Sequence, residues 1–258
     1  MGRLRRSWEL AGPYSVGLSR PHQYMKMMNV SVIMNSLNEN EEYFDTAVRS
    51  ILWNDIKIHL ILSTIDGDPS LKYIKKFSGD IDIVTCKPHK KNVQGSFKQL
   101  NNAIPLIKND YFSFSSSNDM MAFNKYRIEI TRMRRKGHKV CYSAFYVTDE
   151  RLNIRTKQEF MEYNYNSHLQ GNYVYDCSTV ETKTLKKYLP FSMKYYNMGF
   201  WDLWLRMYLG EGDIFIYNPI PVMYYRQSAE SMHVKRRNDP KKMQEYRKQR
   251  ELFIQQYR

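Results

Sequence analysis

The chain has 258 residues, of which 42% are hydrophobic and 14% aromatic, a composition that supports a large core and excludes disorder throughout. Its longest apolar runs, such as residues 60–62, are a few residues long, whereas a membrane-spanning helix needs about 20, so we expect no integral membrane protein. The formal net charge of +14 is concentrated at the two ends, and the three cysteines form no Cys-x-x-Cys pair, which argues against a disulfide framework or a cysteine zinc site.

Residues 1–28 are predicted to form a flexible basic leader. They carry several arginines, glycines and prolines, show no periodicity, and contain no apolar segment of the length found in signal peptides. Because nothing marks the chain for export, a cytoplasmic location is the default expectation.

Short apolar segments alternate with amphipathic ones between residues 29 and 150. Asn38 is predicted to cap the first helix, with Glu41 three residues further on in capping-box spacing. Short hydrophobic strands joined by helices predict an α/β fold whose mostly parallel sheet is covered by helices on both faces. The predicted strands are 30–34, 58–62, 81–84, 111–114 and 139–147, and the predicted helices are 43–52, 70–77, 96–108 and 124–136.

Polar segments follow three of these strands. They are residues 35–38, 64–68 and 115–119, and two of them carry carboxylates. Ligands of open α/β sheets bind beyond the carboxyl ends of the strands, so these three segments predict a shared binding site at one edge of the sheet.

The second half of the chain is less regular. Residues 151–200 are rich in Tyr and Asn, whose aromatic faces and amides suit sugar rings. Helices are predicted at 181–189 and 201–209, and strands at 214–217 and 222–225. Asp239-Pro240 is a favourable helix start, and it predicts a basic final helix that runs to about residue 257.

Several motifs, taken in order, resemble the family 2 glycosyltransferases, which have the GT-A fold. The resemblance covers residues 29–237, and the order and spacing of the motifs carry it. The motifs are Val30-Ser31-Val32-Ile33-Met34, Asn38-x-x-Glu41-x-Tyr43, Asp66-Gly67, Asn101-x-Ala103-Ile104, Asp110-Tyr111-Phe112-Ser113-Phe114, Val140-Cys141-Tyr142-Ser143, Trp201-Asp202-Leu203-Trp204-Leu205-Arg206 and Tyr225-Arg226.

This resemblance implies a single GT-A (Rossmann-like) domain over 29–237, with a nucleotide-sugar half at 29–150, an acceptor half at 151–237, and a basic helix at 238–258. The implied activity is the inverting transfer of a sugar from a nucleoside diphosphate to an acceptor hydroxyl. The residue roles that it implies are nucleotide binding by Asn35, Asn38 and Asp66, contact of Asn118 and Asp119 with the diphosphate and with Mn²⁺ or Mg²⁺, deprotonation of the acceptor by Asp202, and diphosphate contacts by Arg206 and His233.

Two departures from the family pattern bear on the chemistry. The two aspartates of the metal motif fall on Ser116 and Asn118, and the acidic pair that precedes the Trp-Asp-Leu-Trp stretch is replaced by Gly199-Phe200. Three readings follow: shifted carboxylates take over, metal dependence is weak or absent, or catalysis has been lost.

Some of these residues also have a purely structural interpretation. Asp66 can stabilise a turn, and Asp202 can pair with Arg206 one helical turn away. At the level of the whole chain, the alternatives are an inactive GT-A-like protein that binds a glycan or nucleotide sugar, and a nucleic-acid-binding protein. The acceptor, whether glycan, lipid-linked or protein, is not specified, and the basic C-terminus offers a peripheral membrane contact.

Overall fold

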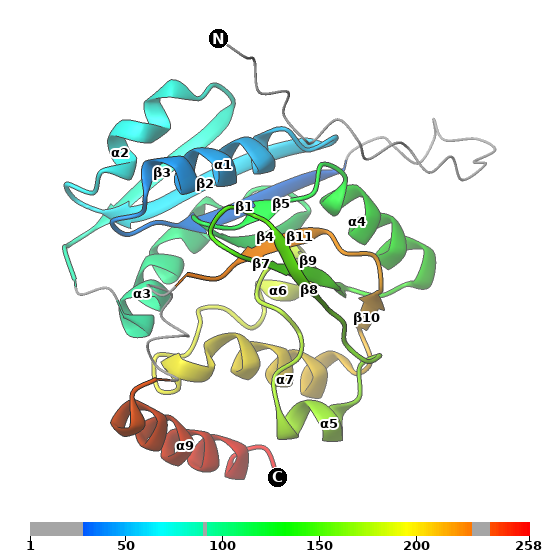
Figure 1. Ribbon diagram of the computed structural model, residues 1–258. Helices are drawn as coiled ribbons and strands as arrows, with labels where there is room; N and C mark the ends of the chain where they lie inside the picture. Colours follow the sequence, from blue (N-terminus) through cyan, green and yellow to red (C-terminus); the bar gives the residue numbers. More distant parts are fainter. Residues whose placement is uncertain (1–27, 90–91, 229–237) are drawn as a thin grey trace.

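A seven-stranded, mostly parallel sheet forms the centre of the computed structural model, which describes residues 28–89, 92–228 and 238–258 (Figure 1). Its strand order is β10-β6-β9-β4-β1-β2-β3. The strands are β1 (Asn29–Asn35), β2 (Lys57–Ile65), β3 (Asp80–Cys86), β4 (Tyr111–Ser116), β6 (Val140–Ser143), β9 (Thr179–Glu181) and β10 (Phe215–Asn218).

Helices cover both faces of this sheet, as predicted, because the side chains of β1 alternate between two cores. Val30, Val32 and Met34 pack against α1 (Glu41–Leu52) and α4 (Lys125–Lys136). Ile33 points to the other face, where α3 (Val93–Ala103) and α7 (Gly199–Glu211) supply the partners. With β2 on one side and β4 on the other, β1 is buried at the centre, which explains its continuous apolar run.

A second, four-stranded sheet has the order β5-β11-β7-β8. The single strand predicted at 139–147 is wrong, because the chain leaves the large sheet at Ala144 and continues in the small one. At that point Ala144 donates its N–H to Asn218, and its carbonyl accepts from Val222. The strands of this sheet are β5 (Met120–Met121), β7 (Phe145–Thr148), β8 (Ile154–Gln158) and β11 (Met223–Arg226).

Two further local predictions are corrected by the structure. The cap of α1 is Asn40, whose side-chain oxygen accepts from the N–H groups of Glu42 and Tyr43 at 2.9 and 3.3 Å, whereas Asn38 lies outside the helix with a φ of 49°. The helix predicted at 181–189 is instead the end of β9 followed by the short α6 (Thr182–Leu185). The antiparallel β9 is inserted between β4 and β6, and it makes the sheet mixed.

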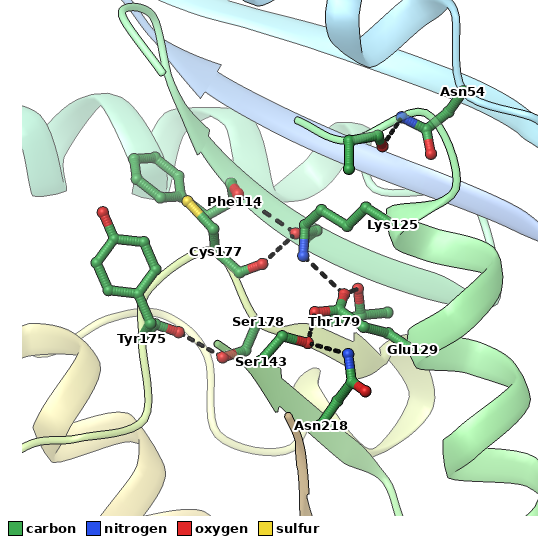
Figure 2. A network of polar contacts seen from close by, with 12 residues as sticks. Asn54, Phe114, Lys125, Glu129, Ser143, Tyr175, Cys177, Ser178, Thr179 and Asn218 are labelled. Atoms are coloured by element: carbon green, nitrogen blue, oxygen red, sulfur yellow. Dashed lines mark hydrogen bonds and ion pairs between the residues drawn. The ribbon is translucent and has the colours of Figure 1, made fainter. Parts of the chain in front are cut away.

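A buried polar network joins α4 to three strands of the large sheet (Figure 2). The Lys125 ammonium lies 2.6 Å from Glu129, and both side chains are almost fully buried. The hydroxyls of Ser143 and Thr179 donate to the two oxygens of this carboxylate at 2.6 and 2.5 Å. A buried charge is tolerated when its hydrogen-bonding capacity is met, and this network fixes α4 against β6 and β9.

The remaining helical elements are α2 (Ser70–Tyr73), α5 (Tyr165–Gln170), α9 (Pro240–Gln255) and the 3₁₀ turns η2 (Ile74–Lys76), η3 (Ile104–Leu106) and η4 (Tyr196–Met198). The predicted C-terminal helix is confirmed as α9, with Asp239 as its N-cap. It packs against α7 at the end of the molecule far from α1 (Figure 1). Within the described residues, no helix has the length and apolar character needed to cross a membrane.

Candidate functional site

The three polar segments predicted to converge do meet at one edge of the large sheet. Asn35, at the end of β1, is in register with Ser63 of β2 and Ser116 of β4. Two side-chain contacts tie the following loops together. Asp68 accepts from the Asn38 N–H at 2.7 Å, and the Ser117 hydroxyl lies 3.2 Å from Glu39.

On the β2 side of this edge, the two aspartates of the Asp66-Gly67-Asp68 loop have different surroundings. Asp68 is buried and accepts from Asn38 and from both the N–H and the hydroxyl of Ser70. Asp66 is exposed and its side chain makes no hydrogen bond or ion pair with another described residue, so its carboxylate is available to a ligand. The structural role in this loop therefore belongs to Asp68, which sequence reasoning did not single out.

At the end of β1, Asn35 donates through its amide to the carbonyl and hydroxyl of Ser96 at 2.8 and 3.0 Å. Its Oδ1 is buried and has no hydrogen-bond partner among the described residues. Asn38 is exposed, with its backbone held by Asp68. Both asparagines thus lie at the edge where the sequence placed them.

Beyond β4, Asp119 and Arg226 form a buried contact at the same edge. Asp119 is 1% exposed, and its Oδ1 accepts from the Arg226 N–H at 2.9 Å, while Oδ2 has no partner in the described part of the chain. Burial raises the pKa of Asp119 to about 7, although the N–H and the charge of Arg226 act in the opposite direction.

The Arg226 guanidinium also locks the neighbouring segments. Its Nε donates to the Asn118 carbonyl at 2.8 Å, Nη1 donates to the Glu150 carbonyl, and the group lies 4.0 Å from the centre of the Tyr43 ring. Arg226 therefore links β11, the loop after β4 and α1 in one rigid arrangement. The sequence pointed to it only as part of the Tyr225-Arg226 motif.

The donor set at Asn118 and Asp119 does not fit a divalent cation. The Asn118 side-chain oxygen accepts from Ser116 at 2.5 Å, and one Asp119 oxygen is bonded to Arg226, which leaves a single buried carboxylate oxygen. Across the described ranges, no three His, Cys, Asp or Glu side chains gather into a possible metal cluster. Mg²⁺ and Mn²⁺ need several oxygen ligands, and here the charge of Arg226 already acts on Asp119.

Asp202 lies elsewhere, where α7 meets α9. It is 2% exposed, and its two oxygens accept from the Arg206 Nε at 2.8 Å and from the Tyr257 hydroxyl at 2.6 Å. Arg206 also donates to the Tyr188 carbonyl at 2.5 Å. The side chains of both residues are engaged in helix packing, and within the described residues neither makes a hydrogen bond or ion pair with the strand-end loops. His233 lies outside the described residues.

An aromatic cluster occupies the positions at which the acidic pair was missing. Phe200 is 5% exposed, and its ring centre lies 5.6, 5.3 and 4.9 Å from those of Phe97, Phe114 and Phe191. Any side chain at Gly199 would meet the Phe97 ring at 2.4 Å. The packing here is apolar and leaves no place for two carboxylates.

Asp176, in the loop before β9, is a further carboxylate near this edge. It is partly exposed and has no hydrogen bond or ion pair with another described residue, yet the surrounding protein raises its pKa to about 7 by burial. Asp176 and Asp119 both raise the pKa values of the same neighbours, Tyr175 and Tyr225. Sequence reasoning missed Asp176 because it belongs to no motif with characteristic spacing.

These features define a class of protein: an α/β domain with GT-A-like topology and a polar site at the carboxyl ends of its parallel strands. A family model described as "Glycosyl transferase family 2" matches residues 31–197, and the chain belongs to this family. A comparison with curated protein sequences found no match.

The fold is also similar to that of solved structures of S. aureus TarS. The fragment 1–349 in complex with UDP superimposes with a TM-score of 0.64 at 16% identity, over 79% of this chain and 62% of that one. The same fragment in complex with UDP-GlcNAc gives a TM-score of 0.62 at 15% identity, over 81% and 61%. The chain therefore spans about three fifths of the TarS fragment, and at this identity the likeness establishes the fold.

Proposed function

We propose that this family 2 glycosyltransferase transfers a sugar from a nucleoside diphosphate to an acceptor hydroxyl, with inversion at the anomeric carbon. The observation that carries the proposal is the meeting of three polar loops, from distant parts of the chain, at the carboxyl ends of β1, β2 and β4. Binding of UDP and of UDP-GlcNAc by TarS, which has the same fold, supports a donor of this chemical class.

The proposed donor contacts follow from exposure and charge. Asp66 is free to accept hydrogen bonds from ribose hydroxyls or a base, and Asn35 and Asn38 lie beside it at the same edge. Asn118 and Asp119 would face the diphosphate. Because their oxygens are largely engaged, the donor should bind without a strict need for Mn²⁺ or Mg²⁺.

A second candidate function is binding of a nucleotide sugar or glycan without transfer. The observation in its favour is Phe200, which fills the position of the family's acidic pair with a buried aromatic ring. Both candidates share the donor site, and they differ in whether bond cleavage occurs.

The acceptor and its location belong to the same proposal. A cytoplasmic enzyme acting on a glycan, lipid-linked or protein acceptor fits the absence of a spanning helix among the described residues. The exposed face of α9 carries Lys241, Lys242, Arg247 and Lys248, which suits peripheral contact with an anionic membrane.

Calorimetric titration with UDP-, GDP- and dTDP-sugars, beginning with UDP-GlcNAc, tests the donor site. We expect one class to bind, both with Mn²⁺ and with EDTA. Asp66→Ala should weaken binding about tenfold or more, because one charged hydrogen bond contributes about 1.5–3 kcal/mol. Asp110→Ala, an exposed carboxylate at the opposite end of β4, is the matched control and should bind as the wild type does. Absence of binding by every class would refute the proposal.

A further inference from the structure

The carboxylates of this chain differ in whether they can accept a proton from a substrate. Both Asp202 oxygens are occupied by Arg206 and Tyr257, and the free Asp119 oxygen is buried away from solvent. Asp176 differs from both, because it is partly exposed and makes no hydrogen bond or ion pair within the described residues. Each Asp176 oxygen keeps some contact with solvent. They therefore remain open to a small molecule.

The backbone around Asp176 is fixed next to the strand-end site. On its C-terminal side, the Cys177 carbonyl accepts from the Ser113 hydroxyl of β4 at 3.0 Å. On its N-terminal side, the Tyr175 carbonyl accepts from the Ser178 N–H at 3.1 Å and from the Ser178 hydroxyl, the bond drawn in Figure 2. These bonds hold the loop against β4, three residues before the strand ends at Ser116.

Aromatic rings connect this loop to the Asp119–Arg226 contact. The Tyr175 ring centre lies 4.7 Å from that of Phe145 and 6.0 Å from that of Tyr225. Tyr225 directly precedes Arg226, whose N–H binds Asp119. Asp176 follows Tyr175 in the chain and Arg226 follows Tyr225, so a donor whose diphosphate lies beside the loop after β4 would bring its sugar close to Asp176.

We propose that Asp176 is the catalytic base of the transfer reaction, in place of the acidic pair lost at Gly199 and Phe200; this inference rests on the proposed function. In the reaction, the Asp176 carboxylate takes the proton of the acceptor hydroxyl. The acceptor oxygen forms a bond to the anomeric carbon while the bond from that carbon to the diphosphate breaks. The bonding electron pair leaves with the nucleoside diphosphate.

The electrostatic surroundings suit this role. Protein atoms enclose Asp176 closely enough that burial raises its pKa to about 7, and a base with a pKa close to the working pH combines availability with proton affinity. The same enclosure predicts that Asp176→Asn folds normally, because the neutral form is the one that the surroundings favour.

The test compares three isosteric variants, Asp176→Asn, Asp202→Asn and Asp110→Asn, after circular dichroism has checked their folding. Donor binding is measured by calorimetry. Turnover is measured as release of nucleoside diphosphate from the bound nucleotide sugar, beginning with UDP-GlcNAc, with water as the acceptor. We expect Asp176→Asn to keep the wild-type Kd within about threefold and to lose about 100-fold or more in rate, the usual contribution of a general base. Asp110→Asn should match the wild type, and Asp176→Glu should recover part of the rate.

Each other outcome is decisive. Wild-type turnover in Asp176→Asn, or loss of turnover in Asp202→Asn alone, overturns the assignment of Asp176 and leaves the proposed function standing. Donor binding without any release by the wild type overturns the assignment and favours the binding protein without transfer. Absence of donor binding by the wild type refutes the proposed function itself.

Discussion

Buried ionisable side chains in this protein occur in two different states, charged with partners or neutral without them. Lys125 and Glu129 stay charged as a pair and are supported by Ser143 and Thr179 (Figure 2). His168, at 0% exposure among Tyr163, Tyr173 and Trp201, has no partner for either ring nitrogen within the described residues. Burial lowers its pKa to about 3, so it stays neutral in the folded protein.

We therefore expect His168 to make the protein sensitive to acid. Below about pH 6.5 an unfolded histidine takes up a proton that the folded state refuses until about pH 3, so stability falls as the pH drops through this window. His168→Leu removes this pH-dependent loss of stability. Between pH 7.5 and pH 5, the free energy of unfolding of the variant should gain about 2 kcal/mol relative to the wild type. Urea denaturation at both pH values measures these free energies of unfolding. If the difference between variant and wild type is the same at pH 7.5 and pH 5, His168 does not titrate as described.

At the level of residues, the sequence predicted which polar residues lie at the strand-end edge. Asn35, Asn38, Asp66, Asn118 and Asp119 all lie at the predicted edge, because polar residues after parallel strands have few other places to go. The packing of α9 decided the contacts of Asp202, and no local pattern indicates where a helix 40 residues later will dock. No local pattern singled out Asp176 either, because the residues around its loop come from strands that are distant in the sequence.

Among the elements, α9 is held to the domain by aromatic packing. Phe253 is 0% exposed, and its ring centre lies 5.0 Å from Trp201 and 5.3 Å from Tyr195. The Tyr165 hydroxyl donates to the Tyr257 carbonyl at 2.9 Å. The many exposed cations of α9 leave Phe253 and Ile254 as its buried residues.

Phe253→Ala should detach α9 from α7. Truncation of a buried phenylalanine costs about 3–5 kcal/mol, and we expect a loss of stability of this size in urea denaturation, together with faster tryptic cleavage after residue 240. The neighbouring Leu252 is 53% exposed, so Leu252→Ala is the matched control and should change stability by less than about 0.5 kcal/mol. Equal effects of the two substitutions would contradict the described docking.

The elements of the first half could be predicted because each is local. The β1 run, the amphipathic α1 and the turn at Asp66-Gly67 carry their own periodicity or turn chemistry. In the second half, the helix predicted at 201–209, the strands at 214–217 and 222–225 and the final helix correspond to α7, β10, β11 and α9. The strands β8 and β9 could not be predicted, because they depend on partners. β9 has three residues and exists by pairing with β4 and β6, while the exposed Ile154–Gln158 shows no apolar run and becomes β8 by pairing with β7.

On the scale of the whole molecule, the donor site depends on segments that are far apart in the sequence. Loops after β1, β2 and β4 meet at one edge, and β11 adds Arg226 from more than 100 residues further along the chain. The α7–α9 contact, with Asp202, forms a separate region. Binding of a nucleotide sugar should therefore slow hydrogen exchange in segments far apart in the sequence. It should leave hydrogen exchange in the C-terminal region unchanged.

Hydrogen exchange, measured by mass spectrometry with and without a saturating nucleotide sugar, shows whether the three loops form one donor site. We expect slower exchange in peptides that contain residues 35–40, 64–70 and 115–120, because a ligand at their common edge would shield and stiffen all three. Peptides from α9 should exchange at the same rate in both samples. Protection confined to α7 and α9, or to one loop alone, would contradict a donor site at the strand ends.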